Sequence, residues 1–128
     1  MEKVIEETDV KMPIFSLNLV EACKLYGNYF ENLSAEKIEE MVKEYKMFWR
    51  IIKKNPGMSF TPSKSIDQVW HLHMLHPQNY FADSKGYFNG ILSHSAGFGK
   101  KEGELEKLKE YAKIRDELWF KEYGYYLK

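Results

Sequence analysis

The fold of this chain is decided by the stretch SAEKIEEMVKEYKMFWRII, residues 34–52. Apolar side chains recur in it at every third or fourth position from Ile38 to Ile52, which is the spacing of a helix with one buried face. Ser34 is a suitable N-cap, and Leu33 and Ile38 occupy the positions of a hydrophobic staple around it. The breaker Asn55-Pro56-Gly57 follows. The stretch therefore predicts a long helix with one face in the core.

Two further helices are predicted before and after this stretch. An apolar stripe from Phe15 to Phe30 predicts a helix over about residues 16–30. After the breaker comes a short extended connection, and then Ser65 and Gln68 have the spacing of a capping box. They are expected to begin a helix that contains three of the four histidines of the chain.

The remaining sequence predicts two more helices separated by a loop. Pro77 suits the first position of a helix, with His76 near its cap, and this helix is expected to end near Asn89-Gly90. Residues 93–103 are rich in glycine and are expected to form a loop. A last helix is predicted over about 104–123, with Gly124 just past its end. The chain is thus expected to be all-α, a single compact domain of about five helices over residues 1–128, with a loosely ordered segment at 1–12.

Composition narrows the classes of function. The 128 residues are 44% hydrophobic and 16% aromatic, as in a folded globule, and 19 basic residues balance 19 acidic ones. This balance disfavours nucleic-acid binding and an anionic membrane surface. A single cysteine, Cys23, is expected to be a buried apolar residue in a reducing compartment. No apolar stretch reaches the length of a membrane span, and the acidic start is unlike a secretory signal, so we expect a soluble, cytoplasmic protein.

The chemistry of the chain is concentrated in residues 67–76, where Asp67, His71, His73 and His76 occur together. A helix turns about 100° per residue, so Asp67 and His71, four apart, share a face, whereas His71 and His73 point apart. The candidate metal ligands are therefore Asp67 and His71, joined by His94 from the loop. Such a set suits zinc or non-haem iron, with water in the remaining positions.

A structural role explains the same residues. Histidines on a largely apolar helix are often buried, neutral and satisfied by hydrogen bonds, and a carboxylate four residues earlier can simply orient one of them. His73 in particular shares a stripe with Val69 and Trp70 and is expected to be a core histidine, although it is also an additional candidate ligand. The spacing by itself leaves both interpretations open.

The order of these motifs resembles the glycine-rich domain-containing protein-like family, formerly a domain of unknown function. The resemblance covers residues 38–126 and rests on the following segments: Glu44–Phe48, Pro62-Ser63, Ile66-Asp67, Trp70-His71-x-His73, Tyr80, Tyr87-Phe88, His94 and Trp119–Gly124. It implies that Asp67, His71, His73 and His94 form one shared polar site. Many members have Phe-Gly where this chain has Phe88-Asn89-Gly90, and some have paired histidines where it has only His94. A site that needs two loop histidines would be incomplete here.

Two functions are compatible with this sequence. The first is a noncatalytic protein-interaction or regulatory module, in which the Asp/His cluster is a structural network and exposed tyrosines bind a partner protein. The alternative is a metal-dependent enzyme, for example a hydrolase, in which Asp67, His71 and His94 hold zinc or iron and a bound water is the nucleophile. The sequence leaves open whether the protein is an enzyme, and it does not indicate the oligomeric state.

Overall fold

In the computed structural model of this protein, the described residues are 10–93 and 103–128, and they form helices and no strand. The prediction of an all-α fold is confirmed. The elements are α1 (Leu19–Tyr26), the 3₁₀ helix η2 (Asn28–Phe30), α2 (Ala35–Lys54), α3 (Lys64–Met74), α4 (Pro77–Phe88) and α5 (Glu104–Tyr123).

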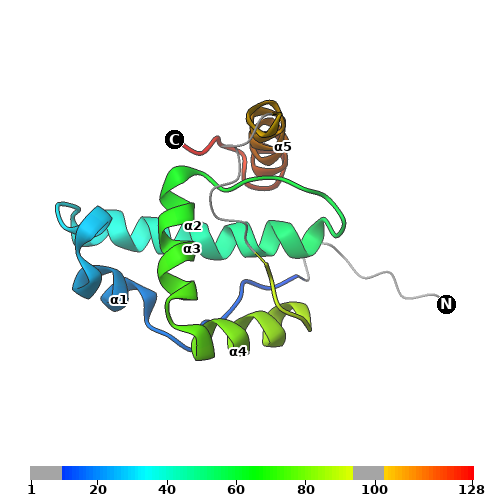
Figure 1. The fold of residues 1–128 in the computed structure, drawn as a ribbon. Helices are drawn as coiled ribbons and strands as arrows, with labels where there is room; N and C mark the ends of the chain where they lie inside the picture. Colours follow the sequence, from blue (N-terminus) through cyan, green and yellow to red (C-terminus); the bar gives the residue numbers. More distant parts are fainter. Residues whose placement is uncertain (1–9, 94–102) are drawn as a thin grey trace.

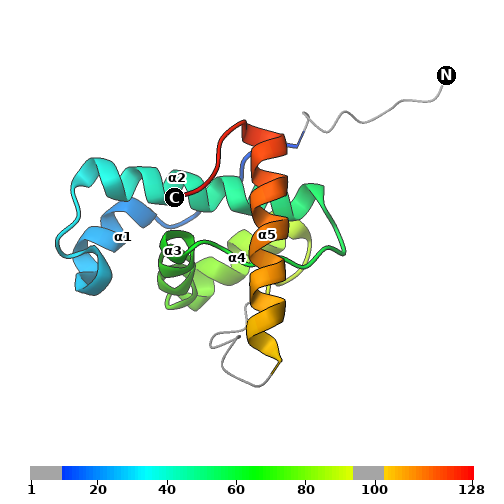
Figure 2. The ribbon, with the colours of Figure 1, turned by 90° about the horizontal axis from the view of Figure 1, so that it is seen from above.

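Helix α2 is the centre of the arrangement (Figure 1). Helices α1 and α3 both pack on α2 and also contact each other, and α4 follows α3 after a sharp turn. Helix α5 crosses α2 near the C-terminal end of α2, as seen from above in Figure 2. Among the described helices, none is long and apolar enough to cross a membrane.

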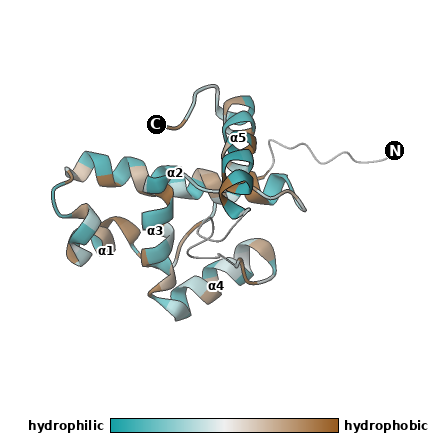
Figure 3. Ribbon diagram, turned by 45° about the horizontal axis from the view of Figure 1, so that its top comes forward, coloured by the Kyte–Doolittle hydropathy of each residue, from teal (hydrophilic) through white to brown (hydrophobic). Residues whose placement is uncertain are grey.

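Helix α2 forms as its sequence predicts. The Ser34 hydroxyl accepts a hydrogen bond from the Lys37 backbone N–H at 3.1 Å, and the helix ends at Asn55. Met41, Tyr45 and Trp49, at successive fourth positions, are fully buried. Hydrophilic and hydrophobic segments alternate along its ribbon (Figure 3). Burying so many large side chains supplies much of the driving force for folding, at about 25 cal/mol per Å² of apolar surface.

The first helix is shorter than predicted. Helix α1 begins only at Leu19, after Asn18, whose side chain accepts a hydrogen bond from the Glu21 N–H at 3.2 Å. It ends at Gly27, whose φ of 76° lies in a region that glycine adopts readily and that a helix does not allow. The prediction of one helix over 16–30 was therefore wrong at both ends.

The start of α3 also differs from the prediction, by two residues. Its N-cap is Ser63, whose hydroxyl accepts from the Ile66 N–H at 3.3 Å, instead of Ser65. Both serines have the side chain that a cap requires, and it is Ser63 that has the extended backbone of an N-cap, with φ −69° and ψ 165°.

The boundaries of the last two helices agree with their predictions. Pro77 occupies the first turn of α4 with His76 as its N-cap, and Asn89 ends it with a left-handed φ of 60°. Helix α5 spans 104–123 and is followed by Gly124 with a φ of 81°. The predicted loop at 93–103 falls almost entirely outside the described residues.

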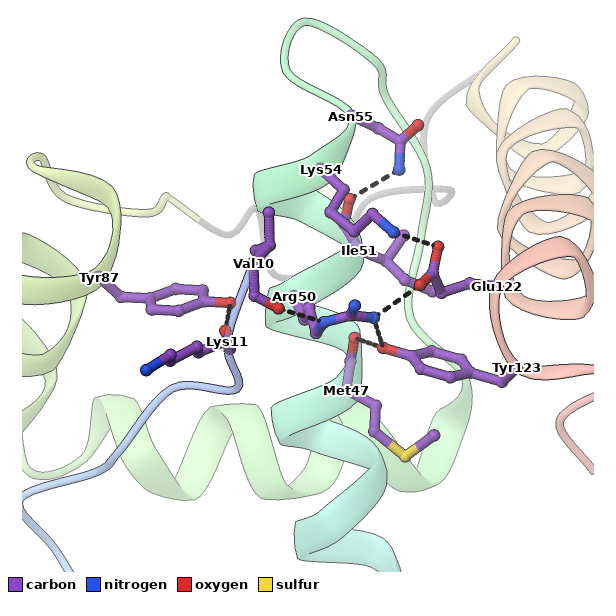
Figure 4. A network of polar contacts seen from close by, with 10 residues as sticks. All are labelled: Val10, Lys11, Met47, Arg50, Ile51, Lys54, Asn55, Tyr87, Glu122 and Tyr123. Atoms are coloured by element: carbon purple, nitrogen blue, oxygen red, sulfur yellow. Dashed lines mark hydrogen bonds and ion pairs between the residues drawn. The ribbon is translucent and has the colours of Figure 1, made fainter. Parts of the chain in front are cut away.

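Helix α5 is held on α2 by a polar network around Arg50 (Figure 4). The guanidinium of Arg50 donates to Glu122 Oε2 at 2.7 Å, and Lys54 Nζ donates to Glu122 Oε1 at 2.5 Å. Arg50 Nε also donates to the carbonyl of Val10 at 2.6 Å, so one side chain joins segments from opposite ends of the chain. Burial opposes ionisation of Glu122, but Lys54 and Arg50 prevail and hold the pKa of this carboxyl below its ordinary value.

We predict that Arg50→Ala lowers the free energy of unfolding by about 2 kcal/mol, because it removes the hydrogen bonds that Arg50 donates to Glu122 Oε2 and to the Val10 carbonyl. The measurement is urea denaturation followed by circular dichroism. Lys37→Ala is the control, because Lys37 forms an exposed pair with Glu40, and its loss should cost about 0.5 kcal/mol or less. Equal effects of the two substitutions would contradict this account of α5.

Candidate functional site

The second histidine of the Trp-His-x-His motif lies in the core. His73 projects from α3 toward α2 and α4 and has no exposed surface. The Tyr45 hydroxyl lies 2.7 Å from its Nδ1, and Asp83 Oδ2 lies 2.9 Å from its Nε2. Because a carboxylate can only accept, the ring proton belongs on Nε2, and the Tyr45 hydroxyl then donates to Nδ1. We call this set the Tyr45–His73–Asp83 network.

Asp83 extends the network to the segment before α1. Its second oxygen, Oδ1, accepts a hydrogen bond from the Ser16 backbone N–H at 2.9 Å. Asn79, one turn earlier on α4, donates to the Ser16 hydroxyl at 3.0 Å. These two hydrogen bonds hold Ser16, which precedes α1, against α4. This is a physical reason why the first helix starts later than its apolar stripe suggests.

Burial controls the protonation of this network. It lowers the pKa of His73, and the hydrogen bond and charge of Asp83 only partly oppose that effect. Burial also raises the pKa of Tyr45 well above its ordinary value. The imidazole and the phenol are therefore both neutral at pH 7. With both ring nitrogens engaged and no exposed surface, His73 is placed to connect helices and not to meet a substrate.

Aromatic rings surround the imidazole and complete its packing. Trp49 stacks on it with ring centroids 5.6 Å apart, and Phe15 and Tyr80 lie at 4.8 and 5.0 Å. The tryptophan of the motif has a similar structural role, because Trp70 Nε1 donates to the Tyr80 hydroxyl at 2.9 Å. That hydroxyl in turn donates to the carbonyl of Leu92, which ties the segment after α4 to the core.

The first histidine of the motif faces the other way. His71 Nε2 lies 3.5 Å from Asp67 Oδ1, and the two side chains are 40% and 30% exposed. These two residues share a face of α3, as their spacing of four predicts, and they are separated from the buried His73. Both side chains are therefore partly exposed, but the Nε2 atom of His71 that faces Asp67 is itself buried.

The third proposed ligand, His94, lies outside the described residues. Within residues 10–93 and 103–128, no three or more histidine, cysteine, aspartate or glutamate side chains are grouped so that they could hold a metal ion. The set of Asp67, His71 and His94 therefore stays a prediction. Both ring nitrogens of His73, the additional candidate ligand, are hydrogen-bonded, one to Tyr45 and the other to Asp83.

Sequence reasoning missed two members of the buried network, Tyr45 and Asp83. The signal for Asp83 was present: it lies three residues after Tyr80 and four before Tyr87, on a helix face that otherwise carries aromatic side chains. An acid in such a stripe needs a buried partner. Cys23 was predicted correctly as a buried apolar residue, and burial raises the pKa of its thiol to about 12.

The sequence of this chain matches a known protein family. The sequence profile of the glycine-rich domain-containing protein-like family matches residues 2–83, more than half of the chain. The chain belongs to the glycine-rich domain-containing protein-like family. The matched region of this family includes Tyr45, His73 and Asp83 and ends at Asp83, within α4. It starts earlier than residues 38–126, on which the motif resemblance rested, and it excludes α5.

Two proteins from Arabidopsis thaliana are similar to this chain in sequence. Glycine-rich domain-containing protein 1 is 28% identical, over 79% of this chain and 14% of its own length. Glycine-rich domain-containing protein 2 is 31% identical, over 60% of this chain and 11% of its own length. The chain thus spans only about one seventh or less of the relatives it matches. No solved structure matches it significantly.

We predict that the His73 imidazole titrates in the folded protein with a pKa below the ordinary value of about 6.5. The unfolded chain then binds a proton more readily, so the stability that depends on neutral His73 is complete above about pH 6.5 and is lost as the pH falls through the lower folded pKa. The measurement is the ring carbon shift of labelled His73 in an NMR titration, together with urea denaturation between pH 7 and 5. A midpoint at or above 6.5 would contradict the assigned burial.

Proposed function

We propose that this domain is a noncatalytic protein-interaction or regulatory module. The observation that carries the proposal is the burial of His73, the second histidine of the Trp-His-x-His motif, between Tyr45 and Asp83. A group with no exposed surface and both ring nitrogens bonded serves to fix the relative positions of α2, α3 and α4. Its role is then to hold a particular surface in shape, and binding through that surface is the function this arrangement supports best.

The distribution of aromatic side chains supports a binding role. The sequence contains four adjacent aromatic pairs, Tyr29-Phe30, Tyr80-Phe81, Tyr87-Phe88 and Tyr125-Tyr126, and predicts that each places one ring inward and one outward. Two do so, because Phe30 and Tyr80 are buried while their neighbours Tyr29 and Phe81 are exposed. Tyr87 and Phe88 are both half-buried, whereas Tyr125 and Tyr126 are both exposed, so the expectation was wrong for these two pairs. Exposed aromatic side chains are enriched where proteins bind one another.

We predict that the purified domain retains a defined, stoichiometric partner from a native lysate and that the complex persists in EDTA. Hydrogen bonds and apolar contacts, unlike a bridging metal, are unaffected by a chelator. The measurement is affinity capture followed by calorimetry with the purified partner. A Tyr45→Ala variant, in which the network is broken, is expected to bind the partner more weakly. Loss of every partner on chelation would contradict the proposal.

A second candidate function is metal-dependent catalysis, and the convergence of Asp67 and His71 favours it. Asp67 Oδ1 and His71 Nε2 lie 3.5 Å apart and are ligand types that zinc and iron accept, and the buried position of Nε2 requires an ion to sit between the two side chains. With His94 as a third ligand, an ion would retain open positions for water, and a metal-activated water is a nucleophile for hydrolysis.

We predict for this second candidate that untagged protein, purified without chelator or nickel resin, contains about one zinc or iron ion per chain, and that His71→Ala removes it. The measurement is elemental analysis. His76→Ala is the matched control, because His76, the N-cap of α4, is bonded through Nδ1 to the Leu72 carbonyl of α3 at 3.1 Å, and metal content should not change. Metal-free, fully folded wild-type protein would eliminate this candidate.

A further inference from the structure

The outer side of α4 is bordered by two grooves. The first has a volume of about 580 Å³ and lies between α4 and the segment 10–14. The second has a volume of about 620 Å³ and lies between α4 and the residues that follow it, up to Ile91. Ala82 lines both grooves, so they meet along one ridge of the helix. Helix α4 lies at the edge of the molecule in Figures 1 and 3, which leaves this ridge accessible.

Each groove presents exposed apolar side chains. Ile14, which lines the first, is 92% exposed, and Met12 beside it is also exposed. Phe81, which lines the second, is 60% exposed, and Ile91 is exposed as well. Single exposed apolar residues are ordinary, but four of them around one helix form a surface that gains free energy when it is covered.

The exposed charged side chains that line the two grooves are all lysines. Lys11 and Lys53 line the first groove and Lys85 lines the second. Asp83 is the one acid among the described residues that line these grooves, and its two oxygens are bonded to His73 and Ser16. Lys53 lies 4.3 Å from the centre of the Tyr87 ring, where the ring supports its charge without neutralising it. The surface is therefore complementary to carboxylates.

The ridge between the grooves is low. Ala82 and Gly86 are one helical turn apart, and a Cβ added at Gly86 would meet nothing within 4 Å. The packing of this chain therefore gives no reason for a glycine there, and glycine inside a helix is unfavourable relative to alanine. A small residue at this point permits the backbone of another element to approach α4 closely.

We propose that the outer face of α4 binds an amphipathic, acidic α-helix of a partner protein. This inference rests on the proposed interaction function and adds the chemistry of the partner. A helix laid along the low ridge at Ala82 and Gly86 places side chains three or four positions apart into the two grooves, where apolar groups contact Ile14 and Phe81. Glutamates at its margins then reach Lys53 and Lys85. The concave grooves fit side chains of a helix better than the flat surface of a bilayer.

The probe is a synthetic peptide of about 18 residues with leucines at helical spacing and glutamates at both margins of that stripe. It is expected to bind and to shift the NMR signals of Ile14, Phe81, Lys85 and Ile91. A second peptide with the same leucines and lysines in place of the glutamates should bind at least tenfold more weakly. Binding of both peptides with equal affinity would overturn the assigned charge complementarity.

Two variants test the site on the protein. Lys53→Glu with Lys85→Glu should weaken binding of the acidic peptide at least tenfold, whereas Lys107→Glu with Lys113→Glu, on the exposed face of α5, should not. Gly86→Leu should keep the fold, because the space beside Gly86 is open, and should also weaken binding at least tenfold by blocking close approach. Unchanged binding in Gly86→Leu, or NMR shifts confined to other helices, would overturn the proposal.

The remaining outcomes separate this inference from the proposed function. Binding to vesicles that contain phosphatidylserine, without binding to the acidic peptide, would replace the helix by a lipid surface and overturn the inference. A partner retained in EDTA from the lysate, by a domain that does not bind the peptide at α4, would leave the interaction function standing and overturn only the site. If both tests are negative, both proposals fail.

Discussion

A neutral imidazole held between a tyrosine hydroxyl and a carboxylate is the constraint on which this structure depends. Burying polar groups costs several kcal/mol unless each has a partner, and the Tyr45–His73–Asp83 network supplies those partners from three different helices. Because the groups are satisfied only when α2, α3 and α4 take these positions together, the network selects one packing of the helices over others that bury similar apolar area. The hydrogen bond from the Ser16 N–H to Asp83 also fixes the segment before α1 relative to these helices.

The residues of the motif on α3 fall into a buried part and a partly exposed part, which we call the inner and the outer part. His73 and Trp70 face the core, and His71 and Asp67 face outward, because a helix sends residues two apart to nearly opposite sides. Trp70 and His73 of the inner part both form buried hydrogen bonds between helices, and this structural role accounts for their presence without a chemical reaction. In the outer part, the side chains of Asp67 and His71 are partly exposed to solvent.

Most helix boundaries followed from local rules. The Ser34 cap, Pro77 at the start of α4 and Gly124 after α5 act within one turn of their position, so their effect can be read from neighbouring residues. The errors arose where distant residues decide the outcome. The first helix starts late because Ser16 is bonded to Asp83, which lies 67 positions along the chain. For the candidate site, the spacing correctly indicated that Asp67 and His71 share a face, but Tyr45 and Asp83 were missed because their role depends on contact between helices.

The sequence by itself determined the all-α class, the buried face of the long helix after Ser34 and the divergence of His71 from His73, because these follow from periodicity and from the fixed geometry of a helix. The family followed from the motifs that this chain shares with it. Only the tertiary structure decided which carboxylate His73 meets, how Arg50 joins the segment at Val10 to α5 through Glu122, and which side of α4 the described residues leave exposed. Those outcomes depend on how helices pack against one another, and packing brings together residues whose separation along the chain carries no signal of their contact.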